Sequence, residues 1–186
     1  MSKNLGLFES EYTINGRHAT RLKSLAKSDG VEADNPNAAN IFERYIDVYM
    51  NAAVLGIYYR RKAEVDTSSK DKARIFPDTF IRERDNCIFL YRLVMLLDES
   101  EKLTRDERIN RAFRYDTADD KADEVKKNLE LFNAYVRGGI DILYKTFTDG
   151  CQNRDDYLKK IFSVMTDFQN ELDGIDCDAK IAKLIE

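Results

Sequence analysis

The sequence contains few of the residues that interrupt a helix. Only two prolines and eight glycines occur in 186 residues, and these two residue types most often mark turns and loops. Their scarcity favours long helices over an architecture of many strands and turns. We therefore expect an all-α, single-domain helical bundle of five to seven helices, covering residues 36–186, preceded by a less regular N-terminal arm over residues 1–35.

Histidine is almost absent, because His18 is the only one in the chain. Di-iron carboxylate bundles require a Glu-x-x-His motif from each of two helices, and HExxH zinc sites require two histidines. No glycine-rich phosphate loop occurs either. The acidic run from Asp116 to Glu124 falls at an expected helix N-terminus, where the helix dipole favours acids without any metal. We expect a non-enzymatic protein with no catalytic residues, no metal and no cofactor.

Closely spaced cysteines and long apolar runs are also lacking. Cys87, Cys151 and Cys177 lie far apart, and an odd number without a close pair is typical of a reducing compartment. The first residues contain no apolar segment typical of a signal peptide. The longest apolar run, residues 87–97, is interrupted by Arg92 and is too short for a membrane span. These features predict a cytoplasmic protein without a membrane partner.

Positive charge is not in excess. The chain has 30 Lys and Arg against 34 Asp and Glu, a net charge of −4 and a pI of about 5.3. General nucleic-acid binders usually carry a clear basic excess. The balance therefore argues against general nucleic-acid binding, although it permits a local basic patch.

The first long helix is expected from Pro36 to about Glu64, with Asn35 as its N-cap. A narrow polar stripe ends at Asn51, and the residues from Ala52 to Tyr59 are all apolar, glycine or tyrosine. That half of the helix must be surrounded by protein, either by its own domain or by a partner. Gly56 would permit close approach of another helix. The predicted partner-helix surface comprises Ala52, Leu55, Gly56 and Tyr59.

The remaining elements follow from caps, turns and periodicity. Asn15-Gly16 indicates a turn, so a short hairpin or an extended arm could precede a helix over residues 17–28, and residues 66–74 are expected to form a loop. A second long helix should follow Pro77, over residues 78–99, and pack against the first at the centre of the fold. Thr104 and Glu107 have the spacing of a capping box that begins a short helix.

The C-terminal half is expected to hold a long amphipathic helix, capped by Thr117 and ending near Thr148. Gly138-Gly139 within it predicts a kink or a tight crossing. A further helix over residues 155–172 should bury an apolar face, and a last short helix should follow Gly174. The residues expected to be buried on the 155–172 helix are Tyr157, Leu158, Ile161, Phe162, Met165 and Phe168.

The cation run Arg60-Arg61-Lys62 allows two interpretations. It can be a helix C-terminus that emerges into water, where cations favour the negative end of the dipole. It can instead contact phosphates or an acidic partner, together with the nearby Lys70, Lys72 and Arg74, while Tyr58 and Tyr59 stack on bases. The candidate nucleic-acid or acidic-partner contacts are therefore Arg60, Arg61, Lys62, Lys70, Lys72 and Arg74.

Other polar residues are expected to be structural. The arginines at positions 105, 108, 111 and 114 are three residues apart, which spreads them over half a helical turn, so a solvated face is expected. Asp47 and Asp141 lie between apolar neighbours, and each should pair with an arginine one turn away, Arg44 or Arg137 respectively.

The excess of apolar helical surface is the main functional indication in the sequence. We expect a helical interaction or scaffold subunit that binds a protein partner in a cytoplasmic assembly or self-associates into a homo-oligomer. The alternative is an accessory nucleic-acid-binding subunit of a bacterial nucleic-acid-processing or defence complex.

Overall fold

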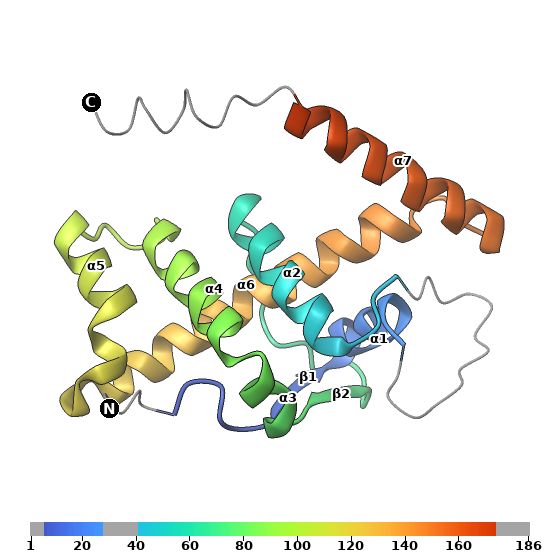
Figure 1. The fold of residues 1–186 in the computed structure, drawn as a ribbon. Helices are drawn as coiled ribbons and strands as arrows, with labels where there is room; N and C mark the ends of the chain where they lie inside the picture. The colour runs from blue at the N-terminus through green and yellow to red at the C-terminus, as the bar shows by residue number, and fades with distance from the viewer. Residues whose placement is uncertain (1–5, 28–40, 174–186) are drawn as a thin grey trace.

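A computed structural model describes residues 6–27 and 41–173 (Figure 1). Over these residues the chain forms seven α-helices and one two-stranded sheet, which confirms the predicted all-helical bundle. The strands are β1 (Tyr12–Asn15) and β2 (Lys72–Ile75). The helices are α1 (Gly16–Leu25), α2 (Tyr45–Tyr58), α3 (Pro77–Arg82), α4 (Arg84–Leu97), α5 (Arg105–Phe113), α6 (Ala122–Thr148) and α7 (Arg154–Asp173).

Helices α2 and α6 form the centre of the fold (Figure 1). At their crossing, a Cβ built on Gly56 would lie 2.1 Å from the carbonyl oxygen of Tyr135, and one on Gly139 would lie 1.8 Å from that of Ala52. Only glycine allows the two backbones to come this close. The predicted close approach at Gly56 and tight crossing at Gly138-Gly139 are confirmed. The two predicted long helices were expected to form this centre together. Helix α4 does pack beside α2, but the main neighbour of α2 is α6.

An aromatic cluster fills the core beside this crossing. The rings of Tyr49 and Phe80 lie 5.5 Å apart, and Phe132 lies 5.8 Å from both Tyr49 and Phe8. Burial of such large rings is the main source of stability in a core of this kind. The Tyr49 hydroxyl donates to Asn133 Oδ1 at 2.8 Å, so the one buried polar atom of this ring is satisfied.

The described part of the N-terminal arm, residues 6–27, packs on its own domain. β1 pairs antiparallel with β2, with Tyr12 opposite Ile75, and α1 begins directly after β1 at Gly16. Of the two expected forms, the short hairpin is wrong, because the partner strand comes from the segment expected to be a loop, and the extended form is present as β1. The predicted domain boundary at residues 35 and 36 lies outside the described residues.

The first long helix is shorter than predicted. It begins at Tyr45 and ends at Tyr58, and Arg60 then takes a left-handed conformation with φ of 51°. The chain continues without helical structure along α6, where the Ala63 amide donates to the Ala134 carbonyl at 2.9 Å. The predicted cap, Asn35 and Pro36, lies outside the part of the chain that the structure describes.

The second predicted helix is divided at Glu83 into α3 and α4. The capping box of α5 is confirmed, since the Thr104 amide donates to Glu107 at 2.7 Å and the Glu107 amide donates to Thr104 Oγ1 at 3.3 Å. Thr117 does not cap the long helix. It lies in a 3₁₀ turn, Tyr115–Thr117, and α6 begins later, at Ala122.

Helix α7 turns back over the end of α6 (Figure 1). Ile161 and Val164 pack against the core, as expected for Ile161. Leu158, Phe162, Met165 and Phe168 are instead exposed, so the prediction that they are buried is wrong. The short helix predicted after Gly174 lies outside the described residues. None of the described helices is both long enough and apolar enough to span a membrane.

Candidate nucleic-acid interface

The end of α2 exposes two aromatic rings next to three cations. Tyr58 and Tyr59 are 73% and 61% exposed, and their rings meet edge to face at 4.9 Å. The helix ends in a Schellman motif, in which the Arg61 amide donates to Gly56 O at 2.8 Å and the Arg60 amide donates to Ile57 O at 3.1 Å. Arg60 occupies the left-handed position that glycine usually fills, at a cost of about 1–2 kcal/mol.

The cations that follow lie on a backbone fixed against α6. A Cβ on Gly138 would lie 2.1 Å from the carbonyl oxygen of Arg61, so the two backbones touch. Arg137 Nε donates to the Ala63 carbonyl at 2.9 Å. We call residues 58–62, with their two aromatic rings and three cations, the aromatic–basic turn. Its backbone is held in place by the capping hydrogen bonds at the end of α2 and by tertiary contacts with α6.

Two of the three cations in this turn have no acidic partner in the described part of the chain. Arg60 pairs with Glu99 at 2.8 Å. Arg61 is exposed and makes no ion pair with any described residue. The Lys62 ammonium lies 5.6 Å from the centre of the Tyr135 ring, a cation–π contact that leaves its charge uncompensated. The first interpretation, a helix C-terminus that emerges into water, is confirmed, because α2 ends at Tyr58 and the three cations follow its end and are exposed.

The other predicted contact residues lie on a separate element. Lys72 and Arg74 belong to β2, and Lys70 lies in the loop before it; all three are exposed. Arg74 Nε lies 3.7 Å from Glu11. The structure thus keeps Arg60, Arg61 and Lys62 together on one turn. A loop separates this turn from the other three predicted residues, Lys70, Lys72 and Arg74.

Acidic residues hold that loop against α1. The Arg17 backbone amide donates to Asp66 at 2.6 Å, and the amide of Ser68 donates to the same carboxylate. These hydrogen bonds lower the pKa of Asp66 to about 2. Asp71 pairs with Lys23 and accepts from Thr20 at 2.7 Å. The second basic group is therefore interleaved with ionised carboxylates, unlike the aromatic–basic turn.

The predicted partner-helix surface divides between interior and exterior. Ala52 and Gly56 are buried against α6 of the same chain, and Leu55 is half-buried. Only Tyr59 is well exposed. The prediction of a partner surface is therefore wrong for Ala52 and Gly56, because the helix that they contact belongs to their own domain.

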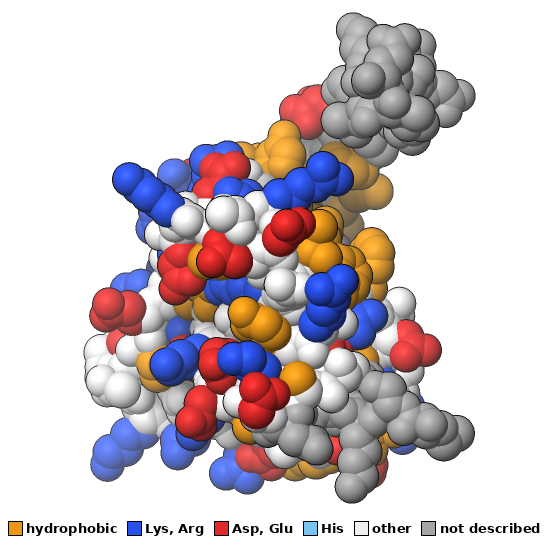
Figure 2. All heavy atoms as spheres, turned by 90° about the vertical axis from the view of Figure 1, so that its left-hand side faces the viewer, with side chains coloured by type: hydrophobic (Ala, Val, Ile, Leu, Met, Phe, Trp, Pro, Cys, Tyr) orange, Lys and Arg blue, Asp and Glu red, His pale blue; other side chains and the backbone are white. Residues whose placement is uncertain are grey.

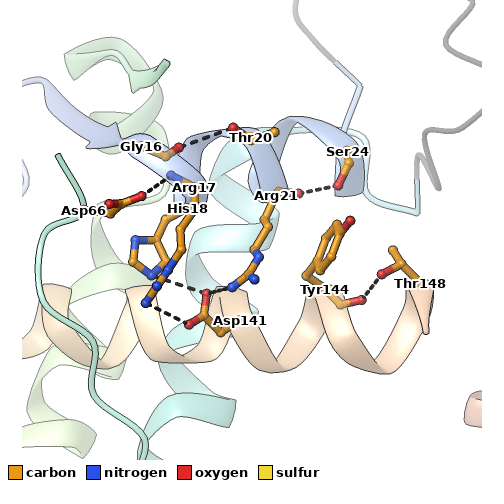
Figure 3. Close-up of polar contacts among 10 residues, drawn as sticks. All are labelled: Gly16, Arg17, His18, Thr20, Arg21, Ser24, Asp66, Asp141, Tyr144 and Thr148. Carbon is orange, nitrogen blue, oxygen red and sulfur yellow. Dashed lines mark hydrogen bonds and ion pairs between the residues drawn. The ribbon is translucent and has the colours of Figure 1, made fainter. Parts of the chain in front are cut away.

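His18 lies in a cluster that joins α1 to α6 (Figure 3). It is fully buried, with Nε2 3.3 Å from Asp141 Oδ1, while Arg17 lies 3.8 Å from Oδ2 and Arg21 also contacts this carboxylate. Burial acts to raise the pKa of Asp141, but His18 and Arg21 lower it further than burial raises it. Arg137 was the predicted partner of Asp141 and is not, whereas the predicted Asp47–Arg44 pair is present.

A second buried network was not predicted. Arg111 was expected on a solvated face, but it is 6% exposed and lies 3.2 Å from Asp98, which also accepts from the Tyr135 hydroxyl at 2.7 Å. Burial acts to raise the pKa of Asp98, and the hydrogen bonds from Tyr135, Ser100 and Arg111 lower it overall. The Lys62 ammonium packs on the ring of the same Tyr135, so this network holds a ring that contacts the aromatic–basic turn.

Metal-ligand types do not gather in the described part of the chain, where no group of three or more His, Cys, Asp and Glu side chains could hold a metal ion. The Asp98 carboxylate has arginine and hydroxyl partners, and the Asp141 carboxylate has arginine and histidine partners. These contacts join helices of the same domain to one another.

Comparison with known proteins identifies a family. A family model described as "DNA sulphur modification system-associated protein 4" matches residues 22–178, which is most of the chain. Searches of curated proteins and of solved structures give no significant match. The matched range includes both basic groups, the α2–α6 crossing and the whole of α7.

Proposed function

We propose a DNA-contacting accessory role for this chain, which belongs to the DNA sulphur modification system-associated protein 4 family. The contact surface is the aromatic–basic turn, residues 58–62. The observation that carries the proposal is its composition: two exposed tyrosine rings stand beside two cations without acidic partners among the described residues. Exposed aromatic rings next to cations favour unpaired bases and their phosphates.

The geometry of the turn supports this role. Its backbone is fixed before any ligand arrives, by the Schellman bonds and by the contact of Arg61 with Gly138. A preorganised surface loses little conformational entropy on binding. A non-glycine residue in the left-handed region is a local strain of the kind that clusters at functional sites. The positive φ of Arg60 therefore agrees with a functional turn.

The family supports the same class of ligand, because its description concerns the modification of DNA. The net charge of −4 makes an extended electrostatic footprint on DNA unfavourable. The proposed contact is accordingly local, and it adds to binding by other components of a modification complex. We infer a non-enzymatic role, in keeping with the structural use of the Asp98 and Asp141 carboxylates.

Charge reversal tests the proposal. Binding of a labelled 20-nucleotide single strand and of the matching duplex is measured by fluorescence anisotropy for the wild type and for Arg61→Glu/Lys62→Glu. We expect the variant to bind the single strand at least about tenfold more weakly, since two phosphate contacts become repulsive. The matched control is Lys126→Glu/Lys127→Glu, two exposed cations on α6, which should bind as the wild type does. Equal losses of affinity in the two variants would show that the effect comes from net charge alone, and would contradict a specific contact at residues 58–62.

A scaffold role is the second candidate, and a different surface favours it. Helices α4 and α5 border a mainly apolar hollow lined by Ile88, Phe89, Leu93, Leu96 and Phe113 together with Asp85 and Arg92. Phe89 is 66% exposed, which is unusual for so large a ring. Figure 2 shows mixed charges over much of the viewed face and hydrophobic side chains gathered along its right-hand side. Such a patch fits a protein component of the same system.

The scaffold role is tested by co-purification with the other proteins of a DNA sulphur modification system in high salt, where DNA-mediated association is lost. We expect Phe89→Glu to abolish a complex that survives in the wild type. A complex that dissolves as salt rises, or one unaffected by Phe89→Glu, would contradict this candidate.

A further inference from the structure

Helix α7 carries an apolar stripe that its own domain leaves exposed. Its members are spaced four, three and three residues apart and are 56%, 75%, 59% and 57% exposed in chain order: Leu158, Phe162, Met165 and Phe168. The neighbouring face, with Ile161 and Val164, already packs on the core. The helix is thus apolar over more of its circumference than its own domain covers, which is the pattern of a helix with a second partner.

We propose that this partner is a second copy of the chain, with the two α7 helices packed antiparallel across a two-fold axis. The area agrees with such a dimer. Each of the four side chains offers roughly 100–150 Å², so two copies would bury about 1,000 Å², the lower limit for a specific interface. The stripe meets itself in an isologous interface, the commonest arrangement of soluble oligomers.

The residues that flank the stripe select the antiparallel orientation. On the outward side these are Lys159, Ser163, Thr166 and Asn170, with a single charge among them. A two-fold axis near Phe162 and Ser163 sets Lys159 of one copy opposite Thr166 of the other. A parallel pair would instead set this polar flank of each copy against the flank of the other copy that holds Ile161 and Val164, which already packs on its own core.

The hydroxyl groups on this flank can be covered without loss. Thr166 Oγ1 donates to the Phe162 carbonyl at 2.9 Å, and Ser163 Oγ donates to Asp167 at 3.4 Å. Because both hydroxyls are bonded within their own helix, a second copy would not strand a donor at the interface. In the same arrangement Leu158 of each copy lies level with Phe168 of the other.

Light scattering after size exclusion tests the dimer on the full chain. We expect the wild type to have twice the 21.6 kDa mass of one chain and Phe162→Glu to have the mass of one. The matched control is Ile81→Glu on α3, whose side chain is 57% exposed and lies on another helix; it should remain dimeric. Circular dichroism verifies that each variant is folded. A monomeric wild type up to about 100 µM, or a dimeric Phe162→Glu, would overturn the proposal.

Disulfide formation tests the orientation. In a background with Cys151→Ser and Cys177→Ser, the pair Lys159→Cys/Thr166→Cys should oxidise to a covalent dimer, whereas Lys159→Cys alone should not. Failure of the double variant to form a covalent dimer would contradict the antiparallel arrangement.

Discussion

Gly139 of α6 lies directly against the main-chain carbonyl of Ala52 in α2, so that a Cβ on this glycine would stand 1.8 Å from the carbonyl oxygen. The contact brings the two central helices together backbone to backbone. The position of the aromatic–basic turn depends on this contact, because the same crossing fixes Gly56 against Tyr135 and Arg61 against Gly138.

Gly139→Ala should therefore destabilise the protein strongly. Overpacking a core typically costs about 1–3 kcal/mol, and here a backbone would have to move, so we expect about 3 kcal/mol or more. Gly150→Ala is the control, since a Cβ there meets nothing within 4 Å and only the positive φ of 78° is strained, a cost of about 1–2 kcal/mol. Urea unfolding measures both. Equal losses at the two positions would contradict the close helix crossing.

Asp98→Asn should also be strongly destabilising. The substitution leaves the buried Arg111 guanidinium without its carboxylate at 3.2 Å, and breaking a buried pair in this way costs about 3–5 kcal/mol. Glu101→Gln, an exposed acid three residues away, should change the free energy of unfolding little. If the two variants unfold at the same urea concentration, Arg111 is solvated as its sequence spacing predicts.

The stability of the protein should fall with pH in the acid range. The pKa of Asp98 and of Asp141 is lower in the folded chain than the ordinary value of 3.8. The unfolded state therefore binds more protons as the pH falls below that value, and the stabilisation that is full above it is lost. Asp141→Asn should show a shallower loss between pH 5 and pH 3 than the wild type. If the urea midpoint of the variant falls with pH as steeply as that of the wild type, protonation of Asp141 does not contribute to the acid destabilisation.

Cys87 should resist alkylation in the folded protein. Burial raises the pKa of its thiol to about 12, so almost no reactive thiolate is present near neutral pH. Cys151, which is only half-buried, serves as the internal control. Mass spectrometry after iodoacetamide should find Cys87 modified only in urea and Cys151 modified without it. Rapid labelling of Cys87 in the native protein would show that α4 opens readily.

Local rules predicted part of this fold from the sequence. The capping box at Thr104 and Glu107 and the close approach at Gly56 depend on a few neighbouring residues and are both present. The pairing of β1 with β2 joins residues about sixty positions apart, and no local feature of the sequence predicts this pairing. The end of α2 was missed because no glycine or proline follows Tyr58. Contacts with α6 hold Arg60 in its left-handed conformation instead.

The candidate site was only partly predictable for the same reason. Arg60, Arg61 and Lys62 are adjacent in sequence and remain together, whereas their separation from Lys70, Lys72 and Arg74 follows from the sheet and from the loop held by Asp66. Helical periodicity identifies an apolar face on α7 but does not say what covers it. Likewise, the spacing of Arg111 could not indicate that Asp98 lies beside it.

The salt dependence of single-strand binding tests the account most directly. Anisotropy titrations between about 50 and 200 mM salt compare the wild type with Arg61→Ala/Lys62→Ala. Each phosphate neutralised on a single strand contributes about 0.7 to the slope of log affinity against log salt, so removing two cations should make the slope shallower by about 1.4. That decrease is the result we predict. An unchanged slope, or a wild type that does not bind at the lowest salt, would contradict a DNA contact at the aromatic–basic turn.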